Sequence, residues 1–436
     1  MRFIMEVGPG TRGGYRTAPV DRVAPLPPFR VGLMAYLAAF AFTIYQLVVQ
    51  TSYSPLREEI GADLALDTMQ SSAISATFLV TYACMQIPAG ILLDRFGATR
   101  LLPLAAGLLG GATVVFSLSG SVAGAVVGRG LMGIAAAFAF PSIGMVLRRG
   151  IDTRWFPVFM GLADIGLGLG GMIGTAGADR LAAAIGWRGA MQAAAAAAIP
   201  IAFGAWLCLP RDRFGGGPAG AARAPVLASL RTIVADRQVR LAAVIYAGGC
   251  GTLYGFGTMW NRPLSLAWSL SPDEATIVDF AFFLGVAAGA PLTGLAEVWL
   301  GARRTLAWGI VLALASFMFW AFVPIDFTVW FDAVNVAIVG AGLASTVLAF
   351  TVACRGLPAE HAATAVGVVN FAGVVSGAAL QVVPGLVMRL VDHSELFRLQ
   401  VSSGVIFALS LTVALVASMR LSRDGPRPHG APAGGG

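Results

Sequence analysis

The stretch Gly90-Ile-Leu-Leu-Asp94-Arg95-Phe-Gly97-Ala-Thr-Arg100 lies between two long apolar segments and places an acid and two arginines where the first segment ends. A second copy of its frame, Gly294-Leu-Ala-Glu297-Val-Trp-Leu-Gly301-Ala-Arg303-Arg304, follows in the second half of the chain. The spacing from glycine to glycine and on to the last arginine is the same. A short charged hinge that recurs at matching places in two halves predicts a duplicated membrane protein.

The composition agrees with a protein that crosses the membrane several times. Of the 436 residues, 57% are hydrophobic and 12% are charged, which is about half the charged fraction of a soluble domain. The four cysteines stand in apolar segments without CxxC spacing, so neither a disulfide framework nor a metal site is expected. The sequence contains no GxxxxGK[ST] loop, no HExxH and no GxGxxG between a strand and a helix. We therefore expect no cofactor and no enzyme activity.

A membrane-spanning helix needs about 20 mostly apolar residues, and runs of this kind predict twelve spans, six in each half. They lie near 31–50, 70–93, 101–118, 121–147, 156–178, 188–209, 239–260, 274–298, 305–323, 329–354, 361–388 and 397–419. The fold class is therefore an all-α polytopic membrane protein in contact with the lipid bilayer. The small-xxx-small patterns Gly166-xxx-Gly170 and Gly285-xxx-Gly289 predict close contacts between helices.

The predicted organisation has five parts. A disordered cytoplasmic tail precedes a first six-helix bundle. A flexible cytoplasmic linker with a short amphipathic helix then leads to a second bundle and a second cytoplasmic tail. In residue numbers the parts are 1–30, 31–209, 210–238, 239–420 and 421–436.

The placement of arginines predicts the orientation in the membrane. Most of them fall in the tails, the linker and the two hinges, while the segments on the other side mix arginines with acids. The positive-inside rule then puts both termini in the cytoplasm. The formal net charge of +7 is explained by topology, so we expect no nucleic-acid partner. We expect a multi-pass protein of the inner membrane.

The first hinge resembles the one that the major facilitator superfamily carries between spans two and three, roughly G-x-L-x-D-R-x-G-x-[RK]-[RK]. Gly90, Asp94, Arg95, Gly97 and Arg100 match it, with Leu92 or Leu93 at the leucine position. The second copy departs, because Val298 stands at the acid position and Glu297 lies one place early. The resemblance covers about residues 31–420. It implies two six-helix bundles in a monomer and secondary active transport by alternating access.

In that superfamily the hinge acid holds a cytoplasmic gate opposite the start of span eleven, which His361 opens here. The resemblance therefore implies a gate at Gly90, Asp94, Arg95, Gly97, Arg100 and His361. The alternative is a solvated charge in a turn.

A charged side chain in hydrocarbon costs at least about 2.5–3.5 kcal/mol on insertion scales, so each one is a candidate for function. Asp164 lies on a glycine-lined stretch, and its counterpart in the second half is Asn370. Equivalent positions should face one central cavity, so the two predict a site for solute or proton near the middle of the membrane. The alternative for Asp164 is a satisfied hydrogen bond between helices.

Arg129 lies about 12 Å into span four, counting about 1.5 Å per residue. Asp179 is nearer to it in depth than Asp164, so Arg129 and Asp179 are predicted to form an ion pair. A role of Arg129 in binding solute or proton stays open. Asp279 is predicted to lie at the membrane interface, near the start of span eight.

Spans one, four, seven and ten line the cavity of the resembled superfamily. Tyr45, Gln46, Tyr254 and Asn335 are therefore further candidates for solute contact, with core packing as the alternative for each. Together these features predict proton-coupled uptake of a small polar organic solute. The alternatives are a proton-coupled exporter and a sensor that resembles a transporter without transporting.

Overall fold

The computed structural model of the protein describes residues 27–152, 155–215, 233–323, 328–355, 357 and 359–421. Within its helices it gives only the backbone at positions 87, 94, 156–158, 160, 164, 212–213 and 359–364. The described residues form helices and no β-strand. Nearly all of both predicted tails, and the part of the linker predicted to form an amphipathic helix, lie outside the described residues.

The chain is divided by the linker into two sets of helices. The first set is α1 (Phe29–Thr51), α2 (Tyr53–Asp63), α3 (Thr68–Phe96), α4 (Ala98–Ser117), α5 (Val122–Ala136), α6 (Ala139–Gly150), α7 (Phe156–Met172), α8 (Ala178–Ala196), α9 (Ala198–Cys208) and α10 (Arg211–Phe214). The second set is α12 (Arg237–Gly255), α13 (Asn261–Ala267), α14 (Pro272–Leu300), α15 (Ala302–Phe322), α16 (Val329–Ala344), α17 (Leu348–Cys354), α18 (Ala359–Met388), α19 (Glu395–Leu399) and α20 (Val405–Met419). Short π-helical turns join α7 to α8, α12 to α13 and α19 to α20.

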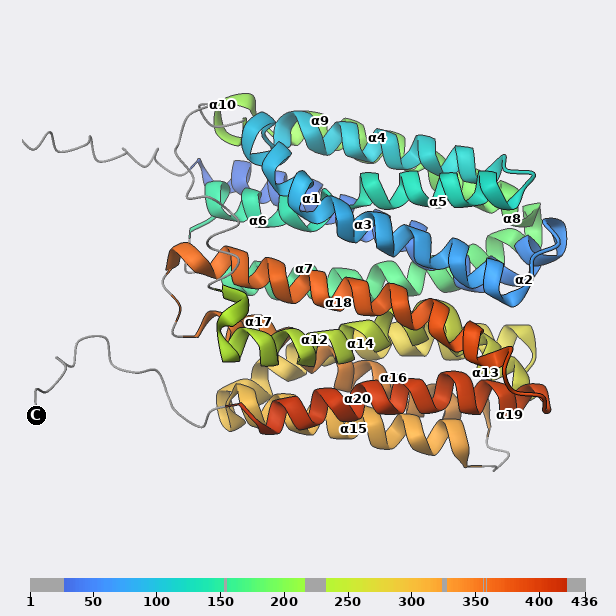
Figure 1. The fold of residues 1–436 in the computed structure, drawn as a ribbon. Coiled ribbons are helices and arrows are strands. Elements are labelled where there is room, and N and C mark those ends of the chain that lie inside the picture. The colour runs from blue at the N-terminus through green and yellow to red at the C-terminus, as the bar shows by residue number, and fades with distance from the viewer. Residues whose placement is uncertain are drawn as a thin grey trace, which may run out of the picture.

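The two sets of helices lie side by side, with the first set above the second in Figure 1 and with α7 and α18 along the boundary. Inside the first set, α3 and α4 pack on α5, and α1 packs on α6 and α7. Inside the second set, α12 packs on α18 and α20, and α14 packs on α16. The most extensive contacts between the sets are those of α3 with α18 and of α7 with α14. Each pair combines the second predicted span of one half with the fifth of the other, as a duplicated chain requires.

The helices α3 and α14 show the duplication in detail. Each is 29 residues long and begins at a capping box, made by Asp67 with Gln70 in α3 and by Ser271 with Glu274 in α14. Each ends at a hinge glycine with a positive φ, which is 80° at Gly97 and 76° at Gly301. This backbone conformation is essentially open to glycine alone. The repeated spacing of the two hinges therefore reflects a repeated backbone turn.

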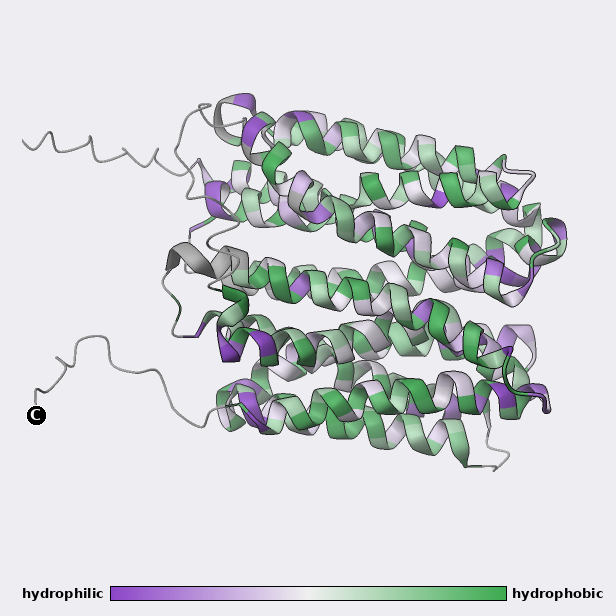
Figure 2. Cartoon of the chain, in the orientation of Figure 1, coloured by the Kyte–Doolittle hydropathy of each residue, from purple (hydrophilic) through white to green (hydrophobic). Residues whose placement is uncertain are grey.

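Hydropathy follows the long axis of the helices. Figure 2 shows hydrophilic residues gathered at the two ends of the molecule and hydrophobic residues between them. Ten helical segments of the described residues are long and apolar enough to cross a membrane. One of them, Gly161–Cys208, runs through two predicted spans and bends at Gly186. The helix α3, which covers the predicted span 70–93, is not one of these ten segments. The all-α polytopic class is confirmed, and the structure is consistent with twelve spans.

The predicted small-residue contacts are present. A Cβ added to Gly166 would lie 2.3 Å from Phe40, and one added to Gly170 would lie 2.8 Å from the carbonyl oxygen of Ile44 on α1. Gly285 and Gly289 meet the backbone of α16 in the same way. Without a hydrophobic driving force between helices in lipid, such close packing is a main source of association. These glycines fix the spacing of the helices that surround the centre of the molecule.

Candidate functional site

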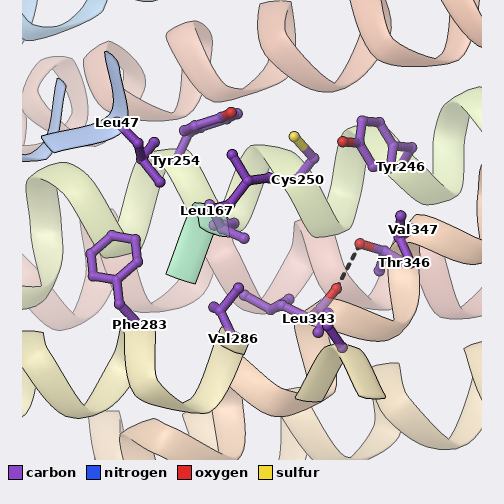
Figure 3. Close-up of a pocket in the computed structure, with 13 residues that line it drawn as sticks. Leu47, Leu167, Tyr246, Cys250, Tyr254, Phe283, Val286, Leu343, Thr346 and Val347 are labelled. Atoms are coloured by element: carbon purple, nitrogen blue, oxygen red, sulfur yellow. Dashed lines mark hydrogen bonds between the residues drawn. The ribbon is translucent and has the colours of Figure 1, made fainter. Parts of the chain in front are cut away.

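A pocket lies between the two sets of helices near their middle (Figure 3). Leu47 of α1 and Leu167 of α7 reach it from the first half. The rest of the lining comes from the second half: Tyr246, Cys250, Leu253, Tyr254, Phe283, Val286, Ala290, Leu343, Ala344, Thr346 and Val347. Its volume is about 70 Å³, measured as the space open to the centre of a water molecule. Since about 10–15 Å³ of that measure holds one water, the pocket in this conformation accommodates only a small solute.

The wall of the pocket is apolar with a few polar groups. Tyr246, Cys250 and Tyr254 follow one another along α12, and Thr346 adds a hydroxyl group that donates to the carbonyl oxygen of Leu343 at 2.7 Å (Figure 3). No charged side chain of the described residues lines it. Of the four cavity residues predicted from spans one, seven and ten, Tyr254 is the one that the structure places in this lining.

Tyr45 and Gln46 of α1 are buried away from the pocket, while their neighbour Leu47 lines it. The Tyr45 hydroxyl group approaches Gly110 of α4, inside the first half. Successive residues on a helix point about 100° apart, so only one of three neighbours can face a given direction. Gln46 is 3% exposed, and its Oε1 has no hydrogen-bond partner among the described residues.

Asn335 does not reach the central pocket. Its Oδ1 accepts a hydrogen bond of 2.8 Å from Ser316, which ties α16 to α15. It lines a separate shallow pocket beside Phe331 and Val334, which are exposed on the outside of the helices. Asn335 is therefore a contact between neighbouring helices, and the prediction that it lines the cavity is corrected.

The side chains of Asp164, Asp94 and His361 lie outside the described residues, although their backbones belong to α7, α3 and α18. Asn370 is half-buried on α18. In the predicted gate, Arg95 is exposed and lies over the ring of Phe96, with 5.2 Å from its Cζ to the ring centroid. The paired roles of Asp164 with Asn370, and of the gate residues, stay predictions.

Arg129 of α5 is 1% exposed and lies inside the first half. Its guanidinium group donates to the carbonyl oxygens of Val49 and Gln50, each at 3.4 Å, in the last turn of α1. Its Cζ lies 4.9–6.0 Å from three ring centroids, those of Tyr53, Phe78 and Phe116. A helix C-terminus and aromatic faces both attract a cation. These contacts hold the junction of α1 and α2 against α5.

The predicted ion pair between Arg129 and Asp179 is not formed. Asp179 instead accepts a hydrogen bond of 2.8 Å from Thr276 and lies 3.5 Å from Arg262, both in the second half of the chain. Similar depth suggested the pair, but depth leaves the direction of a side chain free. The π-helical turn Ile173–Gly177 directly precedes α8 and sets the direction in which Asp179 points.

Arg262 is the centre of a polar contact between the two halves at the end of the molecule where α2 and α13 lie, called the α2 end from here on. It is 3% exposed and reaches Glu58 at 3.2 Å as well as Asp179. Its Nη1 also donates to Thr276 at 2.8 Å. A second cross-pair at this end joins Arg389 to Asp67 at 2.7 Å.

Asp279 also belongs to this contact. It is fully buried, and its carboxyl group lies between Asn261 of α13 and Ser54 of α2. Its position near the membrane interface stays a prediction, but protein groups and not solvent surround it. Distance from the end of a helix measures depth in the membrane, whereas Asp279 is removed from water by the opposite half of the chain.

The sequence of residues 31–381 matches the family model of the Major Facilitator Superfamily. The chain belongs to the major facilitator superfamily. Its fold, its paired halves and its hinge sequence agree with this assignment, and the resemblance inferred from the hinge is confirmed. The superfamily consists of multi-pass membrane transporters, so the expectation of a transporter rather than an enzyme is confirmed as well.

Two curated proteins, both named as transporters, are similar in sequence over part of the chain. The probable sulfoacetate transporter SauU of Cupriavidus necator is 31% identical over 163 residues, which are 36% of each chain. The probable anion transporter 5 of Arabidopsis thaliana is 31% identical over 117 residues, which are 26% of this chain and 27% of that one. The matched segments thus span about a third of the first relative and about a quarter of the second.

Solved structures show the same fold at low identity. A bacterial homologue of the human lysosomal transporter Spinster, in an inward-facing and unoccupied conformation, has a TM-score of 0.65 at 15% identity, over 91% of this chain and 96% of that one. A mutant of the nucleoside transporter NupG has a TM-score of 0.70 at 13% identity, over 89% and 99%.

The superfamily fold brings together residues that the sequence did not mark as a group. Arg262 looked like one of the arginines that set topology, and Glu58 like the acid of an exposed segment. The available signal was Asn261, a polar residue next to Arg262 at the end of an apolar run. An amide and an arginine in succession at a helix end indicate a polar contact more strongly than either does alone.

Proposed function

We propose that this superfamily member is a secondary active transporter that carries a small organic anion across the inner membrane of a bacterium by alternating access. The two halves rock around the central pocket, and protons drive uptake. The printed names of the two curated relatives, a sulfoacetate transporter and an anion transporter, support an anionic solute. The apolar pocket with its hydroxyl groups suits the short carbon skeleton of such a solute.

The proposal rests on the incomplete pairing of the buried guanidinium group of Arg129. Among the side chains that the structure describes, no carboxylate lies within ion-pair distance of its guanidinium group. Its Nε has no hydrogen-bond partner among them, and neither has the Nε2 of the buried Gln50 beside it. Buried charges are normally paired, because an unpaired one is costly. A carboxylate or sulfonate group of the solute would supply the missing acceptor.

The relation of Arg129 to the pocket runs along α1. Leu47 lines the pocket, and Gln50, whose carbonyl oxygen binds Arg129, follows one helical turn nearer the α2 end. An anion in the pocket therefore lies next to the helix turn that Arg129 holds. In the proposed cycle, rocking of the halves brings the anionic group and the guanidinium group together.

The orientation belongs to the proposal too. The end of the molecule where Gly97 meets Gly215 is called the linker end. The positive-inside rule places it in the cytoplasm and the α2 end outside. The contacts at the α2 end then close the outer side of the pocket. Uptake requires that this end open to admit the solute.

Counterflow in proteoliposomes tests the proposal. Vesicles loaded with unlabelled sulfoacetate should exchange it for labelled sulfoacetate, and acetate, malonate and uridine should serve as graded competitors. We expect the anions to compete and uridine to have no effect. Arg129→Gln should lower exchange by about 10–100-fold, the value of one to two hydrogen bonds to a charged group.

Arg129→Lys keeps the charge but loses the fork of donors, and should fall between wild type and Arg129→Gln. Arg180→Gln, an exposed arginine of α8, is the matched control and should exchange at the wild-type rate. Competition by uridine alone, or wild-type exchange by Arg129→Gln, would refute the anion proposal.

A further inference from the structure

Asp279 stands out among the acids at the α2 end because of its surroundings. It lies in the second turn of α14 and is fully buried. Its Oδ1 accepts a hydrogen bond of 2.7 Å from the amide group of Asn261, in its own half. Its Oδ2 lies 3.4 Å from the hydroxyl group of Ser54, in the other half. The carboxyl group therefore bridges the two halves through neutral partners.

Four other acids at this end have arginine partners. Asp67 pairs with Arg389, Asp63 with Arg188, and Glu58 and Asp179 share Arg262. Asp63, Asp67 and Glu58 are exposed, and Asp179 is half-buried. Asp279 combines complete burial with no arginine at ion-pair distance among the described residues. This combination is the one in which a buried carboxylate is most costly.

The charges that face Asp279 come from several elements. α13 contributes Arg262, and α2 contributes Glu58, both close enough to act on it electrostatically. Asp179 of α8 occupies another edge of the same guanidinium group. Asp332 lies in the first turn of α16, and the Asp164 side chain of α7 lies outside the described residues. Arg262 is thus already shared by two acids, and its charge acts on Asp279 from beyond ion-pair distance.

We propose that Asp279 is a proton-exchange site that links proton binding to closure of the α2 end. In the closed state the carboxyl group holds a proton on Oδ2 and donates it to the Ser54 hydroxyl group, while Oδ1 still accepts from Asn261. When the halves part, Ser54 and Glu58 withdraw with α2 and the carboxyl group meets water. The proton then passes to the water outside, and closure requires that the carboxylate take up a proton again from that side. An acidic outer side therefore favours closure of the α2 end, and this group itself carries no proton across the membrane.

This inference rests on the proposed proton-coupled transport and names the group through which the outside pH acts on closure. It also has consequences that do not depend on any solute. A carboxyl group that is protonated in the closed state contributes an infrared carbonyl band that shifts in D₂O. The Asp279→Asn variant removes that band while keeping the shape of the side chain and its hydrogen bonds.

The experiment compares Asp279→Asn with Asp332→Asn, a half-buried acid near the same end of the same half. Both are reconstituted into proteoliposomes and examined by infrared spectroscopy at acidic and neutral pH. Sulfoacetate uptake under an inward proton gradient and counterflow without a gradient are then measured. Asp279→Asn should lose the band and about tenfold or more of gradient-driven uptake, while its counterflow stays within about twofold of wild type.

Asp332→Asn should keep the band, the gradient-driven uptake and the counterflow. Ser54→Ala, which removes only the partner across the interface, should shift the frequency of the band and leave it present. This variant decides the matter if Asp279→Asn does not fold. If wild type moves no anion, the proposed function fails, and the infrared comparison still tests the site. A band and gradient-driven uptake that both persist in Asp279→Asn would overturn the proposal.

Discussion

The two ends of the interface between the halves are built differently. At the α2 end, side chains cross from one half to the other: Arg262 to Glu58 and Asp179, Arg389 to Asp67, and Ser54 to Asp279. At the linker end, the polar contacts of the described residues stay within one half or between a half and the linker, as in Arg355 with Glu297 and Arg149 with Gly215. The α2 end is therefore held shut by polar side chains that must separate for it to open.

Of the variants considered, Arg262→Ala should have the largest effect on stability and on the closure of the α2 end. Breaking a buried ion pair by removing one partner costs about 3–5 kcal/mol, and the exposure of Glu58 places this case near the lower value. We expect a clear fall in the thermal midpoint in detergent. We also expect faster labelling of a Ser72→Cys reporter, which is buried where α3 meets α18, by a membrane-impermeant maleimide.

Arg188→Ala is the control for Arg262→Ala. Arg188 lies at the same end and contacts Asp63 and Ser119, both in its own half. Its loss should leave the labelling of the reporter at the level of the parent protein. Equal labelling in the two variants would mean that the cross-contacts of Arg262 do not keep the α2 end shut.

The hinges at the linker end offer a second test, of intermediate size. Gly97→Ala and Gly301→Ala place a side chain at φ values of 80° and 76°, at a cost of about 1–3 kcal/mol each. Gly90→Ala and Gly294→Ala are matched controls within the adjoining helices, where an added Cβ meets nothing within 4 Å. They should stabilise the protein by about 0.5–1 kcal/mol.

Thermal midpoints of the four glycine variants in one detergent check these values. A loss at Gly90 or Gly294 as large as that at the hinge glycines would show that these helix positions are packed in the folded protein. Equal losses at Gly97 and Gly301 would show that both halves depend on the same turn.

The smallest effects are expected at the exposed pair of Asp67 and Arg389. Arg389→Ala should cost about 0–1 kcal/mol, as surface ion pairs do. Asp67→Ala should cost about 1 kcal/mol more, because the cap of α3 is lost with the pair. Asp67→Asn keeps the cap and should resemble Arg389→Ala. A loss of several-fold that size in Arg389→Ala would assign this exposed pair a share in the closure.

The pH dependence of this pair has a defined sign. The backbone N–H of Gln70 and then the charge of Arg389 hold the pKa of Asp67 below its usual range. Its contribution is complete above the ordinary carboxyl pKa and is lost as the pH falls through the lowered value. The thermal midpoint of wild type should therefore fall with acid slightly more than that of Asp67→Asn. Parallel pH profiles would contradict this contribution.

The fold could be predicted from the sequence because its signals are repeated. The two hinges, the apolar runs and the small-residue patterns each occur in both halves, and every one of them acts through the backbone or through hydropathy. Gly97 and Gly301 illustrate this, because their spacing in the sequence corresponds to one backbone conformation in the structure. A signal of this kind does not depend on what lies opposite.

The candidate site depends on which side chains of other helices lie opposite each residue, so less of the site could be predicted from the sequence. Tyr254 lines the central pocket, and its contact with solute stays a prediction. Tyr45 and Asn335 do not line this pocket, because each turns toward a neighbouring helix of its own half. Asp179 and Asp279 were assigned by depth alone, but Asp179 has its partners in the other half of the chain and Asp279 has one of its two there. No periodicity within one helix records such a partner.

The π-helical turns before α8 and α13 make the direction of side chains at the α2 end depend on the number of residues in the turn. They cover Ile173–Gly177 and Phe256–Trp260, directly ahead of Asp179 and Arg262. A π turn takes one residue more than an α turn, so everything beyond it is rotated by about 100°. Each half thus carries a spare residue that aims a charge at the other half. Deleting one residue from either π turn would therefore turn the charged side chain away from the other half, even though the deletion leaves the composition of the span almost unchanged.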